Sequence, residues 1–436
     1  MSTPISDMIE DTFESLNLSE KDVKSYEYMC FQTSQQNQTT LVNYDLEARL
    51  SGSDLFMRLK DAFILVKMSV TKIDGTFPAN NTVAGLTHGA WSLFLNLVIN
   101  ISGSRVDYNQ NPGQTFNIMA KSSKSADWVV DNGPEYCYWP AGFDNNMSSV
   151  IQSAQDATDD NFLAGKFGGA NNTRWVKLKL CDVLGVCNIQ KLLPGCNITL
   201  SMDKNQVYNE ILMRTVGGDN VDLITSIQQL KLYIPCARLK ERLANKINLA
   251  VLEKKPIPLD FQRIGYFRTN TTNGSAIVSN IFTSSKRPRY ILTGPQLTGQ
   301  ITAQLNKNGG LYIVNNMTEA YISVNGQQYP FVKYLGNGES YLRELEAIKT
   351  FYGKQESNES SSIIRSNNYA NFHAILPFDM SRSDNLFEEN NNADVIVQFN
   401  YNGAEAVAMT FHHVIISECH YKLEFVGGAV QVSSIA

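Results

Sequence analysis

Two stretches of the chain, half its length apart, share one pattern of loop and strand. In the first, Asp182 ends a strand-like run, and an alternating strand begins at Ile198, sixteen residues later. In the second, Asp379 stands sixteen residues before Val395, where a strand with the same alternation begins. The offset from Asp182 to Asp379 is 197 residues, close to half of 436. Self-similarity at a fixed offset indicates repeated structural units.

Within both halves, apolar and polar residues alternate with a period of two, which is typical of strands with one buried face. The runs AFILVKMSV (62–70) and SLFLNLVINISG (92–103) each predict a strand. The expected buried positions are Ile64, Val66, Met68 and Val70 in the first run and Leu93, Leu95, Leu97, Ile99 and Ile101 in the second.

Residues 319–331, EAYISVNGQQYPF, predict a β-hairpin. Their apolar positions alternate with polar ones, at Ala320, Ile322 and Val324. Asn325-Gly326 then supplies the two positive-φ residues of a type I′ turn. The run LNLVINISGSRV in the first half has the same layout of strand, Gly turn and resumed strand.

Helical spacing is clear in two later segments. Residues 236–255 predict a connector helix near mid-chain, with apolar residues at every fourth position, at Leu239, Leu243, Ile247 and Val251. Residues 340–353 predict a second helix with Gly353 as its C-cap and an apolar stripe at Leu342, Leu345, Ile348 and Phe351. At the N-terminus, residues 5–26 form an acidic, weakly amphipathic segment with Met8, Ile9, Phe13 and Leu16 on one side.

These patterns predict an all-β chain of two tandem eight-stranded jelly rolls, a double jelly roll with a few short loop and connector helices. Each unit is long enough to bury a core of its own. The expected domains are an N-terminal arm or helix (1–30), a first jelly roll (31–235) with a long loop excursion (103–175), the connector helix (236–256), a second jelly roll (257–426) with the loop helix (340–353), and a C-terminal tail (427–436).

Composition excludes some classes of function. A formal charge of −5 and a pI near 5.7 argue against a surface built to bind nucleic acid, which needs clustered Lys and Arg. The N-terminus lacks the basic and apolar regions of a signal peptide, and no apolar run reaches membrane-spanning length. Seven cysteines without a C-x-x-C pair indicate reduced thiols. We therefore expect a soluble, intracellular protein.

No catalytic, cofactor-binding or metal site is expected. His412, His413, Cys419 and His420 are the densest group of potential metal ligands, but neighbours on a strand face opposite sides. Cys181, Cys187 and Cys196 are expected to be buried thiols. The paired acids Asp159-Asp160 and Glu388-Glu389 are expected to be solvated, and the Gly-rich run 165–172 lacks the Lys-Ser/Thr of a phosphate loop.

Several motifs resemble the double jelly-roll major capsid proteins of Polinton (Maverick) elements and adintovirus-like DNA viruses. The run WVKLKLCDVLGVCNIQKLLPGCNITLSM fits the family pattern at Leu192, Leu193, Gly195, Ile198 and Leu200. LKLYIPCARL, YLRELEAIKTFYG, ILPFDMSRSDN and HVIISECHYKLEF resemble later elements of that family in the same order. The resemblance covers residues from about 50 to 425. The chain departs from the pattern at Met380-Ser381-Arg382, where Leu-Thr-Pro is common, and lacks the usual Asn-Pro-Phe before the hairpin.

The resemblance implies a structural subunit and no enzyme. Three copies would form a pseudo-hexagonal homotrimeric capsomer that tiles an icosahedral shell. The implied partners are neighbouring trimers, penton or vertex proteins and minor capsid proteins, with no sequence-specific nucleic acid. The implied location is the virion capsid, assembled in the host cytoplasm or nucleus and not secreted.

Two alternatives remain open on sequence alone. A carbohydrate-binding β-sandwich, as a surface or spike protein of a virion, would need exposed aromatic platforms. The candidates for such a platform are Trp128, Tyr136, Tyr138 and Trp139. A hydrolase on a jelly-roll frame is the third reading, and no set of acid and base residues in the sequence favours it.

Overall fold

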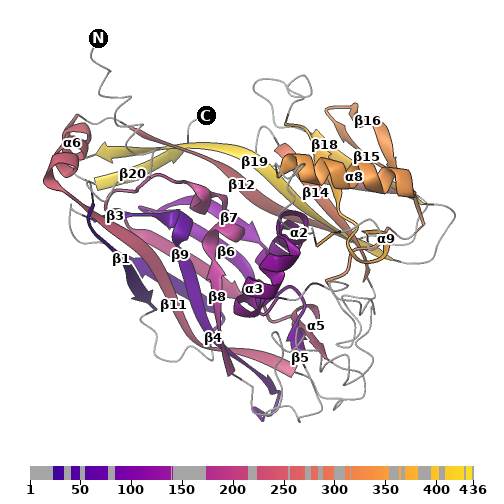
Figure 1. Cartoon of the computed structure of the whole chain (residues 1–436), viewed down its shortest axis with the longest axis horizontal. Helices are drawn as coiled ribbons and strands as arrows, with labels where there is room; N and C mark the ends of the chain where they lie inside the picture. Colours follow the sequence, from indigo (N-terminus) through magenta and orange to yellow (C-terminus); the bar gives the residue numbers. More distant parts are fainter. Residues whose placement is uncertain are drawn as a thin grey trace.

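Strands dominate the computed structural model of the chain (Figure 1). None of the helices it describes is both long and apolar enough to cross a membrane. The structure describes residues 23–33, 41–49, 55–76, 84–138, 140, 173–214, 223–253, 256–270, 276–282, 288–298, 310–314, 316–352, 363–364, 369–381, 394–401, 408–426 and 429–434.

The first half of the chain forms two antiparallel sheets of a sandwich. One sheet has the order β1-β11-β4-β8, with the short β3 (Leu55–Met57) also paired to β11. Its strands are β1 (Val23–Gln32), β11 (Leu223–Leu239), β4 (Phe63–Lys72) and β8 (Thr173–Lys179). The other sheet has the order β2-β9-β6-β7. Its strands are β2 (Asn43–Ala48), β9 (Ile198–Lys204), β6 (Phe94–Ile101) and β7 (Ser104–Gln110). β5 (Ala84–Leu86) and β10 (Leu212–Arg214) pair separately.

The second half repeats this arrangement. Its first sheet has the order β12-β19-β14-β17. The strands are β12 (Ile257–Asn270), β19 (Met409–Val426), β14 (Pro288–Leu297) and β17 (Leu376–Asp379). Its second sheet has the order β13-β18-β15-β16. The strands are β13 (Ala276–Phe282), β18 (Asp394–Tyr401), β15 (Met317–Val324) and β16 (Gln327–Leu335).

Strand for strand, the two halves have the same sheet order, so the predicted repeat is confirmed. The stretches matched in the sequence occupy equivalent places, because β9 and β18 are both the second strand of their sheets. The hairpins β6–β7 and β15–β16 also correspond, and both turn through two residues with positive φ. These are Ser102 (50°) with Gly103 (82°) and Asn325 (49°) with Gly326 (81°). The fold is a double jelly roll.

Each roll has its own apolar core, and the predicted alternation places most of it. Ile64, Val66, Met68 and Val70 of β4 are fully buried, as are Ala320, Ile322 and Val324 of β15. Leu95 was predicted to be buried, and this is wrong: its side chain is 41% exposed. The pairing of β6 with β9 shifts register between Phe94 and Asn96, and a bulge of this kind turns the side chain to the other face.

The helices and chain ends differ from the expected boundaries. The connector helix α6 spans Glu241–Leu252, because residues 236–239 continue β11 and pair with β1 and β3. The loop helix α8 spans Gly338–Phe351, and its Leu342 is exposed rather than part of the apolar stripe. The predicted C-cap, Gly353, lies outside the described residues.

Three segments differ from the expected secondary structure. The predicted arm or helix ends in a strand, β1, which pairs along β11 and is therefore part of the first roll. The described part of the excursion 103–175 contains the expected resumed strand, β7, and two helices that were not expected, α2 (Pro112–Ser123) and α3 (Ala126–Tyr136). The tail contains β20 (Ala429–Ser434), which pairs with β19. The strands that pair with β1 and β20 are not indicated by the local sequence pattern of those segments.

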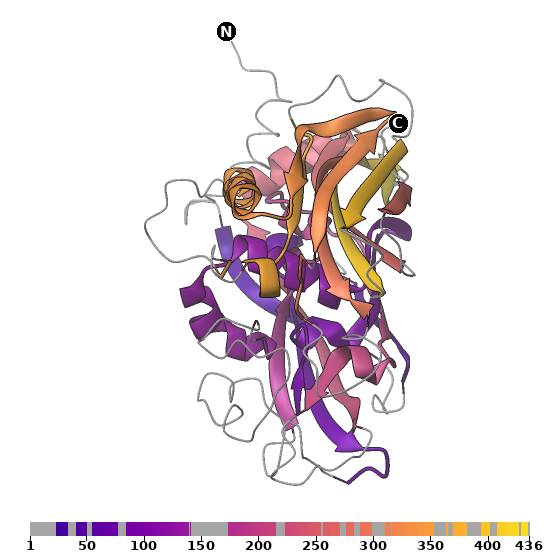
Figure 2. The same ribbon diagram turned by 90° about the vertical axis from the view of Figure 1, so that its right-hand side faces the viewer.

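One pair of long strands joins the two cores. β12 and β19 pair without interruption from Ile257–Leu423 to Asn270–Thr410, and Figure 1 shows them running from α6 to the second roll. Leu259 and Leu423 belong to the core of the first roll, whereas Phe411 belongs to that of the second. In Figure 2 the second roll (orange and yellow) lies in the upper part of the molecule, and strands of the first roll (purple and pink) extend below it.

Candidate functional site

A group of buried polar side chains lies at the junction between the two rolls. Helix α2 lies there (Figure 1) and begins at Asn111, a left-handed N-cap whose side chain accepts a hydrogen bond from the Gln114 backbone N–H (3.1 Å). Pro112 follows at the first helical position, where its missing N–H costs nothing. This cap fixes where the helix starts and which side chains face the second roll.

A chain of hydrogen bonds links α2 to Tyr312 of the second roll. The Tyr312 hydroxyl donates to Gln114 Oε1 (2.7 Å), and Asn117 Nδ2 donates to the Tyr312 oxygen (2.9 Å). The Tyr138 hydroxyl donates to Asn117 Oδ1 (3.1 Å). All four side chains are buried, and a buried network with every member bonded holds one geometry.

Lys121, one turn further along α2, is fully buried against the same segment. Its ammonium donates to the carbonyl oxygens of Gly310 and Phe372 (3.3 Å to the latter) and lies 4.8 Å from the Tyr312 ring centroid. Burial lowers the pKa of Lys121 to about 7. The lysine therefore holds two segments of the second roll, at Gly310 and Phe372, against a helix of the first.

A buried ion pair crosses the junction at β7 and β12. Asp107 accepts hydrogen bonds from the backbone N–H groups of Val186 (3.0 Å) and Tyr108 (2.9 Å), and from Arg263 Nε (3.3 Å). Arg263 also donates to the Tyr421 hydroxyl (2.9 Å). Burial raises the pKa of Asp107 to about 6, although these hydrogen bonds and the guanidinium charge oppose that rise.

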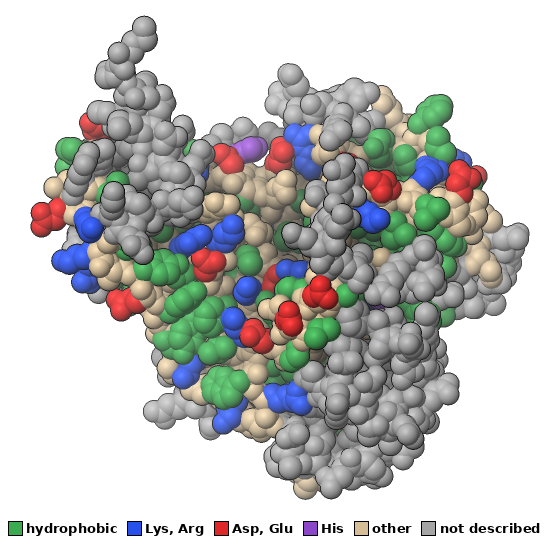
Figure 3. Space-filling model, viewed as in Figure 1, with side chains coloured by type: hydrophobic (Ala, Val, Ile, Leu, Met, Phe, Trp, Pro, Cys, Tyr) green, Lys and Arg blue, Asp and Glu red, His purple; other side chains and the backbone are tan. Residues whose placement is uncertain are grey.

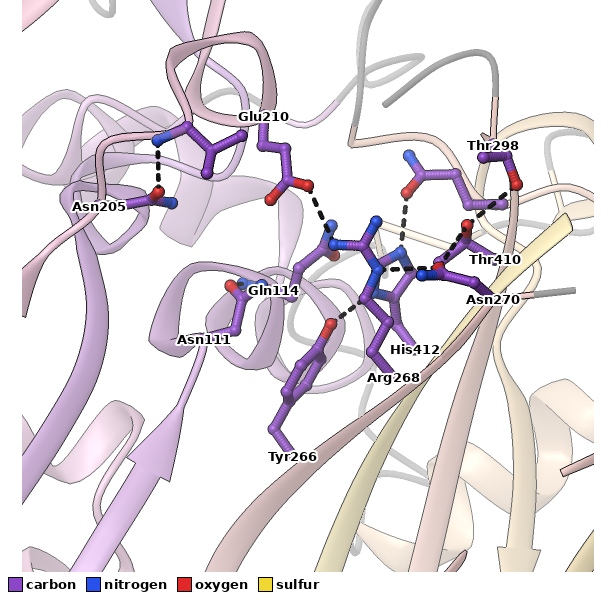
Figure 4. A network of polar contacts seen from close by, with 12 residues as sticks. Asn111, Gln114, Asn205, Glu210, Tyr266, Arg268, Asn270, Thr298, Thr410 and His412 are labelled. Atoms are coloured by element: carbon purple, nitrogen blue, oxygen red, sulfur yellow. Dashed lines mark hydrogen bonds and ion pairs between the residues drawn. The ribbon is translucent and has the colours of Figure 1, made fainter. Parts of the chain in front are cut away.

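A third set of contacts lies beside β12 and β19 (Figure 4). Arg268 of β12 forms an ion pair with Glu210 of α5 (Tyr208–Ile211) in the first roll (2.9 Å). The His412 ring lies between the Tyr266 hydroxyl (2.7 Å from Nδ1) and Gln296 Oε1 (2.9 Å from Nε2). Desolvation lowers the pKa of His412 well below its ordinary value, so the ring is a neutral imidazole with one donor and one acceptor nitrogen for these two partners.

The polar side chains at the junction form hydrogen bonds and ion pairs with one another. Their chemistry is therefore orientation: they fix the angle between two sandwiches. Local sequence reasoning did not find Asp107, Lys121, Arg263 or Tyr312. A signal was present in α2, where Gln114, Asn117 and Lys121 recur at helical spacing and form a polar stripe on an otherwise buried face.

The histidines and cysteines singled out from the sequence do not come together. His413 contacts Thr293 and Ser279, which differ from the partners of His412, and His420 is half exposed beside Asp260 (2.7 Å). Cys187 and Cys196 are buried as expected, whereas Cys181 is partly exposed, which corrects the prediction for that thiol. Desolvation raises the pKa of the Cys196 thiol to about 12. Within the described ranges, no three His, Cys, Asp or Glu side chains are close enough to hold a metal ion. Asp159-Asp160, Glu388-Glu389, 165–172 and Trp139 lie outside those ranges.

The aromatic cluster that a carbohydrate site would need is mostly internal. The Tyr136 ring stacks on Phe116 at 5.3 Å between centroids, and Tyr138 meets the same ring edge-on at 5.1 Å. Tyr136 and Tyr138 are 2% and 1% exposed, and Trp128 packs partly buried against them. These rings form the packing of α2 and α3 on the first roll and leave no flat platform for a sugar.

Comparison with known proteins gives similarity of structure only. No protein-family model matches the chain, and no curated protein sequence matches it. A chain in the Sputnik virophage structure determined by cryo-EM aligns with a TM-score of 0.60 and 12% identity, over 96% of this chain and 90% of that one.

Two further structures align over nearly their full length. The Faustovirus major capsid protein has a TM-score of 0.54 and 9% identity, over 96% of this chain and 94% of that one. The PBCV-1 virus capsid chain has a TM-score of 0.53 and 11% identity, over 94% and 97%. At this identity the likeness establishes the fold alone. The chain has a double jelly-roll fold that it shares from end to end with these viral structures.

Proposed function

We propose that the chain is a major capsid protein, a structural subunit of an icosahedral virus or virus-like element. The observation that carries this proposal is coverage: the fold shared with the PBCV-1 capsid chain and the Faustovirus major capsid protein takes up almost all of both chains. In this proposal the role of the chain is assembly rather than turnover.

The capsomer of this proposal is a homotrimer. Three copies of a chain with two equivalent rolls have six similar units around one axis, and this pseudo-hexagonal outline tiles a lattice. The fixed junction supports this arrangement, since a variable angle between rolls would spoil the outline. The motif resemblance to Polinton and adintovirus proteins supports a source among such DNA viruses, with neighbouring trimers, vertex proteins and minor capsid proteins as partners in the virion.

The mass of the purified protein in solution tests the proposal. Three copies of a 48.7 kDa chain give about 146 kDa. We expect this species in native mass spectrometry, and hexagonal arrays or shells in electron micrographs of concentrated protein. A species that stays at 48.7 kDa at all concentrations, without arrays, would refute the capsomer assignment.

A further inference from the structure

The outer face of the β1-β11-β4-β8 sheet exposes aromatic side chains in a row across its strands. Tyr28 of β1 meets Phe63 of β4 at 5.5 Å between ring centroids, and Phe63 stacks on Tyr233 of β11 at 5.1 Å. Tyr28 is 50% exposed, and Trp175 of β8 is 48% exposed. Figure 3 shows hydrophobic side chains gathered over this part of the first roll. We call this surface the aromatic face.

Lysines are placed among these rings. Lys177 Nζ lies 5.6 Å from the Phe63 ring centroid, and Lys231 Nζ lies 5.9 Å from that of Trp175. Lys177 also forms an ion pair with Glu135 (3.3 Å). Lys67, Lys179 and Lys231 have no carboxylate partner within the described part of the chain. The face therefore combines exposed apolar area with unneutralised positive charge, so its partner should be apolar and acidic.

One segment of this chain has that composition. Residues 1–22 carry six carboxylates against one lysine, with Met8, Ile9, Phe13 and Leu16 spaced for one side of a helix. The segment joins the aromatic face through β1, the edge strand of the same sheet. Val23 pairs with Leu239 at the end of the sheet next to α6, and β1 runs from there toward the aromatic row. The first described residue of the chain therefore lies at the α6 end of the sheet, and the aromatic row lies further along β1.

We propose that residues 1–22 bind the aromatic face of a neighbouring copy, as an acidic amphipathic clasp between subunits. The inference rests on the proposed assembly function and names one contact within it. The apolar side covers the rings, and the carboxylates pair with lysines such as Lys67, Lys179 and Lys231. Attraction between these charges is screened by salt, so the contact weakens as ionic strength rises.

Cross-linking of the full chain tests the clasp, because Cys30 is an exposed thiol on the aromatic face. The variant Ser15→Cys places a second thiol in the segment without removing an apolar or acidic residue. A short bismaleimide should then give a product of two linked chains, about 97 kDa from two copies of 48.7 kDa. Cys30→Ser should abolish it. Ser434→Cys, exposed on β20, is the matched control and should not link to Cys30.

Charge gives an independent readout. Lys231→Glu should lower the cross-linked fraction several-fold, and so should raising the salt from about 0.1 M to about 1 M. Links confined to one chain, links unaffected by Cys30→Ser, or no links would each overturn the clasp. The clasp would also be overturned if anionic vesicles or DNA bound the aromatic face and the cross-linked fraction stayed the same. A trimer of about 146 kDa without the cross-link would refute the clasp and leave the proposed function standing.

Discussion

Replacing His413 with glutamine should make the stability of the subunit less sensitive to acid. His413 is fully buried on β19, with Nδ1 2.9 Å from the Thr293 hydroxyl and Nε2 3.3 Å from the Ser279 hydroxyl. Desolvation disfavours the charged imidazolium and lowers the pKa of His413 from 6.5 to about 3. Glutamine retains a donor and an acceptor but takes up no proton in this range.

The sign of the effect follows from proton binding. The pKa of His413 is lower in the folded than in the unfolded chain, so the unfolded chain binds more protons between about pH 6.5 and pH 3. The histidine's contribution to stability is therefore complete above pH 6.5 and is lost as the pH falls below it. At about pH 5, some 1.5 pH units lower, the loss is about 2 kcal/mol, at about 1.36 kcal/mol per unit.

Urea denaturation of the free subunit at pH 7 and about pH 5 measures this loss. The fall in unfolding free energy between the two pH values should be about 2 kcal/mol smaller in His413→Gln than in the parent. The matched control is Ser417→Ala, because Ser417 is buried on the same strand and carries no ionisable group. It should retain the parent's difference. Equal falls in the parent and His413→Gln would refute the assignment of acid sensitivity to this buried ring.

Three further substitutions test the buried contacts. Asp107→Ala leaves the partly buried Arg263 without its carboxylate and should cost about 2–4 kcal/mol in urea denaturation. A loss below about 1 kcal/mol would contradict the ion pair. Burial raises the pKa of Glu344 to about 8, so its carboxyl group is mostly protonated at pH 7. Glu344→Gln should therefore change the unfolding free energy by less than about 1 kcal/mol. A loss of about 3 kcal/mol would instead indicate a buried carboxylate. Gly185→Ala should lower the unfolding free energy by about 1–3 kcal/mol, because the added Cβ overlaps the Gln262 carbonyl of β12. Gly338→Ala, where a Cβ meets open space, is its control, and equal thermal midpoints for the two variants would contradict the close approach.

Local patterns in the sequence were sufficient to predict the repeated sandwich. Alternation is set by the pleat of a strand, so Ile64 and Val66 could be placed in the core without knowing their partners. The Asn325-Gly326 turn could be predicted because few residues adopt positive φ. Leu95 could not be placed, because the bulge beside it arises from pairing with β9, a strand more than a hundred residues away.

The contacts at the junction could not be predicted from local sequence patterns either, because they also join residues far apart in the chain. Lys121 and Tyr312 are 191 residues apart, and nothing near either one indicates the other. What the sequence does show is an anomaly, a lysine within a helix face that is otherwise suited to burial. Such a residue indicates an inter-element contact but does not identify its partner. Choosing among possible partners requires the two sheets to be assembled first.

Charged groups at the junction, where apolar ones would pack as well, select one orientation of the two rolls. Apolar surfaces tolerate small rotations, because the hydrophobic effect has no direction. Asp107, Lys121 and Arg263 do not, since each would lose its hydrogen bonds while still at least partly buried, and an unsatisfied buried polar group costs about 1–3 kcal/mol. These groups thus raise the free energy of misoriented arrangements of the rolls more than they lower the free energy of the observed arrangement. For a subunit proposed to repeat many times in a closed shell, a single permitted angle between the rolls matters more than added stability.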